Sequence, residues 1–284
     1  MTEVSERVKS MVISSDQVQQ HLQAPERVKQ MVLNSKHIQK KLQADASADA
    51  DAAGFSSGMD STPAVNKQVY DDWAPTYTDD VRKWGYDMPE QVATLLRAIT
   101  TYDAHADVSS DPRAGLPSVD SAVLDAGCGD GLSGLALKAA GFSEAVVGVD
   151  ISPKLLAIAA TRRCYAETQE VDMSQPLPFA SGSFGIVSCT GVLTYLEPES
   201  GVLQEFVRVC KRGGLVCFTN RTDKMEKWAA VTQQLVDATV WEKVHVAAPL
   251  PYLPGNPEYG EKVRAPLCAA VMLPLTSTCV LLPS

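Results

Sequence analysis

A glycine-rich turn after an apolar run constrains this chain more than any other part of its sequence. Residues 123–131 read VLDAGCGDG, in which three glycines alternate after an apolar run that ends in Asp125. This pattern is typical of a strand that turns tightly into a helix and leaves its backbone open to a ligand. About twenty residues later a second apolar run, VVGVDIS, carries Asp150, and a carboxylate there suits the two hydroxyls of a ribose. Together the two runs predict a nucleoside-cofactor site.

The spacing of the glycines separates two classes of cofactor. A dinucleotide fingerprint has its third glycine three residues after the second, and Leu132 occupies that position here. The glycines instead follow G-x-G-x-G, and Asp125 stands two residues before the first of them. A cofactor with a cationic sulfonium and an amino group can use that carboxylate, whereas a pyrophosphate cannot. The pattern therefore favours S-adenosyl-L-methionine over NAD.

Four motifs resemble those of one family, the class I S-adenosylmethionine-dependent methyltransferases. VLDAGCGDG resembles the first motif of that family and VVGVDIS resembles the second. QEVDMSQPLPFASGSFGIVSCTGVLTYL resembles the stretch across the third and fourth strands, and LQEFVRVCKRGGLVCFTNR resembles the following helix, KPGG-like turn and fifth strand. The chain departs from the pattern at Arg212, where proline is common, and at Gly185, where aspartate usually follows phenylalanine. Neither position normally touches the cofactor.

Two further segments resemble one branch of that family, the methyltransferase-like 27 proteins. They read VYDDWAPTYTDDVRKWGYDMP and LPYLPGNPEYGEKV, so the whole resemblance runs from about residue 70 to about residue 263. It implies an enzyme that transfers the methyl group of S-adenosylmethionine to a small-molecule or protein acceptor. The sequence does not identify that acceptor.

The resemblance also implies which residues bind the cofactor. Asp150 would hold the ribose, Asp172 would face the adenine amino group, and Met173 would supply a backbone contact. Tyr70 and Tyr77 lie in a segment that folds over the methionine end of the cofactor in many methyltransferases, although both could simply pack that helix onto the domain. The expected cofactor-binding residues are Tyr70, Tyr77, Asp125, Ala126, Gly127, Cys128, Gly129, Gly131, Asp150, Ile151, Asp172, Met173 and Thr190.

No residue is assigned a catalytic role from the sequence. Methyl transfer is an in-line displacement on an activated cation, so alignment of the reactants can supply much of the acceleration. A general base is needed only when the acceptor must lose a proton before it attacks. The stretch 190–195 follows the fourth strand, where an acceptor would approach, and lacks the N/D-P-P-Y/F motif of many nucleic-acid amino methyltransferases. Trp84 and Tyr86 could line an acceptor pocket or serve as structural aromatics.

The order of apolar runs predicts the fold class. We expect strands near residues 122–126, 145–150, 167–171, 184–190 and 214–220, with helices near 132–140, 153–163 and 201–210 between them, a sixth strand over 241–248 and earlier helices near 65–73 and 89–101. This alternation predicts an α/β, Rossmann-like doubly wound and mostly parallel sheet with ligands at the carboxyl ends of its strands. Asp125, Asp150, Asp172 and Thr190 all fall at such ends.

The N-terminal segment contains a duplication. ERVKSMVISSDQVQQHLQA at 6–24 recurs as ERVKQMVLNSKHIQKKLQA at 26–44, and both copies have helical spacing of apolar residues. We expect residues 1–44 to be a duplicated amphipathic helical extension, which either packs on the domain or binds a protein partner. Residues 45–64 have the composition of a flexible linker and precede the methyltransferase domain at 65–263.

The segment 264–284 departs from the family. It carries no charge after residue 264, and Pro266 interrupts the antiparallel seventh strand expected there. A variant terminus is the interpretation we prefer, ahead of a divergent strand and of a tail anchor, against which the three prolines of the segment argue. We therefore expect a sheet without a stable seventh strand.

Composition limits the partners and the compartment. A net charge of −9 argues against a nucleic-acid partner, and the charged N-terminus without an apolar core argues against secretion and membrane contact. Seven cysteines without paired spacing predict buried thiols in a reducing compartment, and no Cys/His cluster indicates a metal. We expect a cytoplasmic protein, with access to the nucleus left open.

The alternative function is a cofactor-binding scaffold that works through the N-terminal repeat, and an NAD-dependent oxidoreductase is disfavoured.

Overall fold

The computed structural model describes residues 62–100, 117–142, 145–238, 240–246, 249–257 and 260–272. The duplicated segment at 1–44, nearly all of the expected linker at 45–64 and the end of the chain from residue 273 lie outside these ranges. The predictions for those parts of the sequence, including a protein partner for the repeat, therefore stay predictions.

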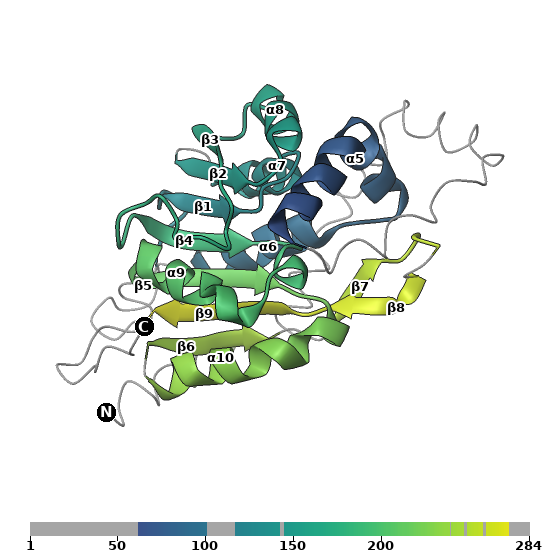
Figure 1. The fold of residues 1–284 in the computed structure, drawn as a ribbon. Helices are drawn as coiled ribbons and strands as arrows, with labels where there is room; N and C mark the ends of the chain where they lie inside the picture. The colour runs from purple at the N-terminus through teal and green to yellow at the C-terminus, as the bar shows by residue number, and fades with distance from the viewer. Residues whose placement is uncertain are drawn as a thin grey trace.

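A seven-stranded sheet forms the centre of the described domain, as Figure 1 shows. Its order is β3-β2-β1-β4-β5-β9-β6, and the neighbouring pairs from β3 to β5 are parallel. These strands are β1 (Val123–Ala126), β2 (Val146–Asp150), β3 (Glu167–Glu170), β4 (Phe184–Cys189), β5 (Cys210–Thr219), β6 (Trp241–Val246) and β9 (Leu267–Met272). The chain order reverses between β1 and β4, and a crevice opens at the carboxyl ends of strands at such a point. The predicted Rossmann-like, mostly parallel fold is confirmed.

Helices cover both faces of this sheet. They are α5 (Pro63–Lys83), α6 (Met88–Thr100), α7 (Leu132–Ala139), α8 (Pro153–Thr161), α9 (Val202–Val209) and α10 (Met225–Asp237). The buried side chains of α6 and α7 share one core cluster with the sheet, and those of α9 and α10 share the other. In α9, Val202, Phe206 and Val209 recur at helical spacing and are fully buried, so the amphipathic pattern of the sequence is what attaches this helix to the sheet. Of these helices, α10 was not anticipated from the sequence.

The seventh strand is present, which corrects the expectation that the segment after Arg264 fails to supply one. β9 pairs antiparallel with β5 on one side and with β6 on the other. Its side chains alternate between the two cores, with Cys268 and Ala270 in one and Leu267 and Ala269 in the other. A strand that is covered on both faces is apolar throughout, so the uncharged sequence is what this position requires. Pro266 precedes the strand and removes no hydrogen bond from its ladder.

A small hairpin precedes this strand and lies apart from the main sheet. β7 (Leu250–Leu253) pairs antiparallel with β8 (Gly260–Ala265). β8 comes directly before the seventh strand in sequence, but it pairs with β7 and not with the main sheet. The hairpin packs against the turn between α5 and α6, where the backbone N–H of Gly255 donates to the carbonyl of Trp84 at 2.9 Å. The hairpin thereby becomes a wall next to the carboxyl ends of the strands.

None of the described helices is both long enough and apolar enough to cross a bilayer.

Candidate functional site

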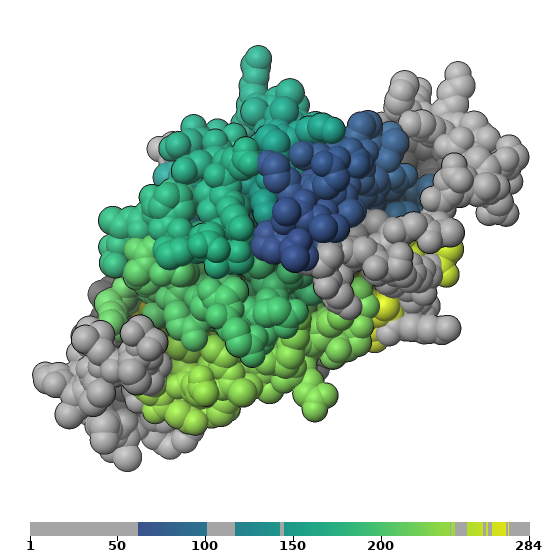
Figure 2. Space-filling model, in the orientation of Figure 1, coloured from purple at the N-terminus to yellow at the C-terminus, as the bar shows by residue number. Residues whose placement is uncertain are grey.

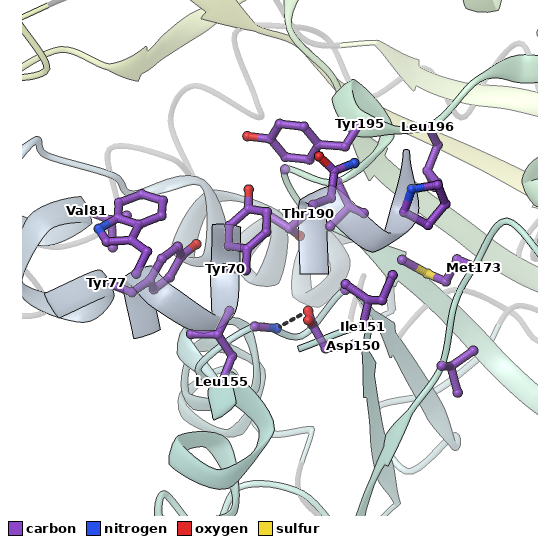
Figure 3. A pocket seen from close by; sticks show the side chains of 18 of the residues that line it. Tyr70, Tyr77, Val81, Asp150, Ile151, Leu155, Met173, Thr190, Tyr195 and Leu196 are labelled. Carbon is purple, nitrogen blue, oxygen red and sulfur yellow. Dashed lines mark hydrogen bonds between the residues drawn. The ribbon is translucent and has the colours of Figure 1, made fainter. Parts of the chain in front are cut away.

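A cavity lies at the carboxyl ends of β1, β2 and β4 and beneath helix α5 (Figure 3). Its floor comes from the loop after β1 and from the residues that follow β2, β3 and β4, and its roof comes from α5. Figure 2 shows α5 in dark blue on the outside of the molecule, lying against the teal elements that follow β1 and β2. The cavity therefore lies at the switch point of the sheet, where the strand order predicts a ligand site.

The glycine loop after β1 leaves space on the cavity side. Gly129 has a φ of +52°, and a Cβ built there would meet no atom within 4 Å. Gly127 has a φ of +82°, and its Cβ would lie 2.1 Å from Cγ2 of Val192. Both conformations favour glycine, and at Gly127 the close approach of the segment after β4 also requires it. The backbone of the loop at Gly127 therefore packs directly against the side chain of Val192, in the stretch that follows β4.

Asp150 ends β2 and presents its carboxylate to the cavity, as Figure 3 shows. Its Oδ2 accepts a 2.8 Å hydrogen bond from the backbone N–H of Gly129, and its Oδ1 accepts one of 2.9 Å from the N–H of Ser152. Burial raises the pKa of this carboxyl, while these backbone donors oppose that rise. A carboxylate can accept about four hydrogen bonds, so each oxygen of Asp150 retains capacity for a hydroxyl of a ligand.

Asp125, by contrast, does not line the cavity. Its side chain is fully buried behind the glycine loop, and its Oδ2 accepts a 2.7 Å hydrogen bond from the hydroxyl of Tyr165. The other oxygen has no hydrogen-bond partner in the structure. Burial raises the pKa of Asp125 to about 7, although the hydrogen bond from Tyr165 lowers it. The structure thus places this residue behind the site rather than in it.

Other expected residues complete the floor. Asp172, Met173 and Ile151 line the end of the cavity beside β2 and β3. The Oδ1 atom of Asp172 accepts hydrogen bonds from the N–H and the hydroxyl of Ser174, at 2.9 and 2.7 Å, which fix the orientation of its carboxylate. Thr190 follows β4, and its buried Oγ1 has no partner in the structure although it lies at the cavity. A buried hydroxyl without a partner is costly, so Thr190 is suited to receive a hydrogen bond from a ligand or to donate one.

Helix α5 is held over the cavity by polar contacts near its start. The hydroxyl of Ser152, the first residue before α8, donates a 2.6 Å hydrogen bond to Oδ1 of Asp71. The ammonium of Lys67 donates to the carbonyl of Ile151 at 3.2 Å and forms an ion pair with Glu170. These contacts join α5 to the ends of β2 and β3, next to Asp150.

A second set of contacts holds α5 nearer its other end. The hydroxyl of Thr78 donates to the carboxylate of Asp130, which lies in the glycine loop. Arg162, at the end of α8, donates to Oγ1 of Thr78 at 2.9 Å and forms an ion pair of 2.5 Å with Asp130. The loop, α8 and α5 are therefore tied together at one point.

Aromatic side chains from α5 and from the turn after β4 form another part of the cavity. Tyr70 packs edge-on against Tyr195 with ring centroids 5.8 Å apart, and Trp73 packs edge-on against Tyr77 at 4.6 Å. Burial and the neighbouring hydroxyls raise the pKa of Tyr70, and burial together with nearby carboxylates raises that of Tyr77. These hydroxyls are therefore neutral at physiological pH.

The sequence predictions for the site divide into two groups. Those that line the cavity are Tyr70, Tyr77, Gly127, Gly129, Asp150, Ile151, Asp172, Met173 and Thr190. Those that do not are Asp125, Ala126, Cys128 and Gly131. The binding role of every residue in both groups stays a prediction. Of the two aromatic residues considered for an acceptor pocket, Tyr86 lines the cavity, whereas Trp84 packs against Trp73 at 5.7 Å.

Sequence reasoning missed several lining residues. Asn66 is buried on α5, Tyr195 lies in the turn after β4, and Tyr252 comes from the β7–β8 hairpin. Each is ordinary in its local sequence, and they meet only because three distant elements converge. The one available signal was the spacing of Asn66, Tyr70 and Tyr77, which places them on one face of a helix. In the described part of the chain no three His, Cys, Asp or Glu side chains are grouped as metal ligands.

This chain is similar in sequence to known methyltransferases. Residues 124–218 match the family model described as a methyltransferase domain. Methyltransferase-like protein 27 of Homo sapiens is 32% identical over 185 residues, which make up 63% of this chain and 69% of that protein. The ubiquinone biosynthesis O-methyltransferase of Albidiferax ferrireducens is 30% identical over 174 residues, which make up 57% of this chain and 63% of that protein.

A solved structure of similar fold is that of the [4+2]-cyclase SpnF. It has a TM-score of 0.50 and 16% sequence identity, and the match covers 76% of this chain and 98% of that one. At this identity the likeness shows the fold alone. Since that protein is described as a cyclase, the fold does not by itself fix the chemistry.

Proposed function

This chain belongs to the class I S-adenosylmethionine-dependent methyltransferases, and we propose that it transfers the methyl group of S-adenosylmethionine to a small-molecule acceptor bound beneath α5. The observation that carries the proposal is one continuous cavity that joins Asp150 and the glycine loop to the aromatic wall. One end of this cavity suits a nucleoside, and the other end suits an organic acceptor.

The residues of the floor fit the cofactor. Asp150 would hold the ribose hydroxyls, because both of its oxygens retain hydrogen-bonding capacity after binding Gly129 and Ser152. Asp172 and the backbone of Met173 would hold the adenine, and the open side of Gly129 gives the cofactor room against the loop. The unpartnered hydroxyl of Thr190 offers one further polar contact.

Transfer itself makes modest demands on the protein. The bound cofactor supplies a methyl group that is already activated on a sulfonium. The protein holds the two reactants in line, and α5 keeps water out of the cavity between them. Tyr70 and Tyr77 of this helix face the cavity, and we propose that they contact the methionine end of the cofactor.

The acceptor does not follow from similarity. Relatives that match parts of this chain have names that specify a quinone precursor pathway, an acyl-carrier protein and a ribosomal RNA. The family model covers residues 124–218, which include the glycine loop, whereas α5, Tyr86 and the β7–β8 hairpin lie outside that range although they also line the cavity. A small molecule is proposed here because the far end of the cavity lies beneath a helix and is lined by side chains from three separate elements.

Calorimetry tests the cofactor half of this proposal. S-adenosylmethionine and S-adenosylhomocysteine should bind, and NAD should not. Asp150→Ala should weaken binding by at least about tenfold, since a hydrogen bond between a charged group and a ligand contributes roughly 1.5–3 kcal/mol. Glu226→Gln, an exposed change on α10, should leave affinity unchanged. Folded protein that binds neither sulfur cofactor would refute the proposal.

A further inference from the structure

Two tyrosines from different elements meet over the end of β4. The rings of Tyr86, after α5, and Tyr252, in β7, pack edge to face with centroids 5.5 Å apart. A Cβ built at Gly191 would lie 2.6 Å from the hydroxyl oxygen of Tyr86 and 3.0 Å from that of Tyr252. Gly191 precedes Val192, which contacts the glycine loop at Gly127. The tyrosine pair therefore contacts Gly191, the residue next to the one that contacts the glycine loop.

This pair belongs to a larger aromatic chamber. We use that name for the part of the cavity lined by Tyr70, Trp73, Tyr77, Tyr86, Tyr195 and Tyr252. The rings come from α5, from the turn after α5, from the turn after β4 and from the hairpin. Aromatic side chains therefore line this part of the cavity on several sides. The charged side chains among the described residues that line the cavity are the carboxylates Asp150 and Asp172, both on the nucleoside side.

The electrostatics of such a chamber favour positive charge. The face of an aromatic ring carries negative potential, and a cation over it is stabilised by about 0.5–2 kcal/mol or more when water is excluded. The hydroxyls of Tyr70 and Tyr86 have pKa values raised by burial, so they stay neutral and bring no competing charge. An anionic acceptor would lose its hydration here and would be repelled by the carboxylate of Asp150, which is near enough to help raise the pKa of Tyr77.

We propose that the acceptor is an amine, held in the aromatic chamber against Tyr86 and Tyr252; this assignment rests on the proposed methyl transfer. The bound ammonium first releases a proton to water. The lone pair of the uncharged nitrogen then forms the bond to the methyl carbon, and the bond from that carbon to sulfur breaks with its electron pair left on sulfur. The products are S-adenosylhomocysteine and a methylated ammonium, whose proton passes to water. Positive charge thus moves from sulfur to nitrogen inside the chamber, and the ring faces stabilise it before and after transfer.

Matched probes separate charge from shape. Choline has a positively charged quaternary nitrogen where 3,3-dimethylbutan-1-ol has an uncharged quaternary carbon, and the two molecules otherwise have the same shape. 3,3-Dimethylbutanoate has a similar skeleton and carries a negative charge. We expect protein saturated with S-adenosylhomocysteine to bind choline at least about fivefold more tightly than the alcohol, and the carboxylate more weakly than either. Calorimetry measures all three without turnover.

Variants at Tyr86 test whether the ring is responsible. Tyr86→Leu should abolish the preference for choline, and Tyr86→Phe, which keeps the ring and removes the hydroxyl, should retain it. The affinity for S-adenosylhomocysteine should be the same in both, which shows that each variant is folded with an intact cofactor site. Equal binding of choline and the alcohol by protein that binds S-adenosylhomocysteine would overturn the amine assignment and leave the proposed function standing. Protein that does not bind S-adenosylhomocysteine would remove the proposed function and the assignment with it.

Discussion

The hydroxyl of Tyr165 donates a 2.7 Å hydrogen bond to Oδ2 of Asp125 behind the glycine loop. The same hydroxyl accepts a 2.9 Å hydrogen bond from the backbone N–H of Gly134 in α7. The second oxygen of Asp125 has no partner, and its pKa is raised to about 7 by burial. The loop that faces the cavity therefore lies over a carboxyl group whose pKa burial raises to about 7.

Ionisation of Asp125 should destabilise the protein as pH rises. Between about pH 4 and pH 7 the folded state retains a proton that the unfolded state has lost, so raising the pH through this window favours unfolding. The loss should total on the order of a few kcal/mol and level off above about pH 8. Asp125→Asn cannot ionise at this position and should lack this component. Denaturant unfolding at pH 5 to 8 measures the free energy of unfolding of the unmodified protein and of Asp125→Asn, both without cofactor. The same dependence on pH in the two proteins would contradict the expectation.

Tyr165→Phe tests the same pair from the other side. The hydrogen bond from Tyr165 lowers the pKa of Asp125, so its removal should move the fall in stability to higher pH. The change also leaves the N–H of Gly134 without its partner, which should cost about 1–3 kcal/mol at every pH. A uniform loss of stability without a shift along the pH axis would show that the hydroxyl does not act on the carboxyl.

The glycine loop should not tolerate a methyl group at Gly127. Gly127→Ala places a Cβ 2.1 Å from Val192 and forces a side chain into a positive φ, so both stability and affinity for S-adenosylhomocysteine should fall. Gly182 has a similar φ of +68° with nothing within 4 Å of its Cβ. Gly182→Ala is therefore the matched control and should cost only about 1–2 kcal/mol of backbone strain, with cofactor affinity kept. Thermal unfolding and calorimetry distinguish the two, and equal effects would contradict the close packing of the loop.

The contact between Asp71 and Ser152 should govern how firmly α5 covers the cavity. Asp71→Ala removes the acceptor for the Ser152 hydroxyl, so S-adenosylhomocysteine should dissociate several-fold faster. Asp72→Ala alters the neighbouring exposed residue, whose ion pair with Lys154 is 3.8 Å long, and should change little. Stopped-flow release of the ligand measures both rates. Equal release rates from the two variants would show that this contact does not hold the helix over the ligand.

The strand β9 should be essential to stability. Ala269→Pro removes a ladder donor from a strand that is paired on both sides, and the acceptor left without a partner should cost about 1–3 kcal/mol. Pro266→Ala, in the connection before the strand, should have a small effect because Pro266 takes no part in the ladder. A melting temperature unchanged by Ala269→Pro would show that the strand does not contribute.

The sequence by itself determined the sheet and the cofactor side of the site. Apolar runs alternate with helical patterns. Asp150 ends β2, and Asp172 and Thr190 lie just after β3 and β4. Since the carboxyl ends of parallel strands meet at one edge of a sheet, the order of strands along the sequence was enough to predict that these residues lie close together. The same reasoning gave the glycine loop, whose spacing is itself a constraint on the backbone.

The tertiary structure decided everything that depends on contacts between distant segments. Asp125 has the sequence context of a cofactor ligand, but its carboxylate lies behind the loop, where it accepts a hydrogen bond from Tyr165. Tyr86 and Tyr252 form one wall of the aromatic chamber although more than half the domain separates them in sequence. From the sequence alone, the uncharged segment after Pro266 was predicted not to form the seventh strand. The structure shows that it forms β9 between β5 and β6. Its composition is correct for a strand buried on both faces, and burial is a property of the fold rather than of the segment.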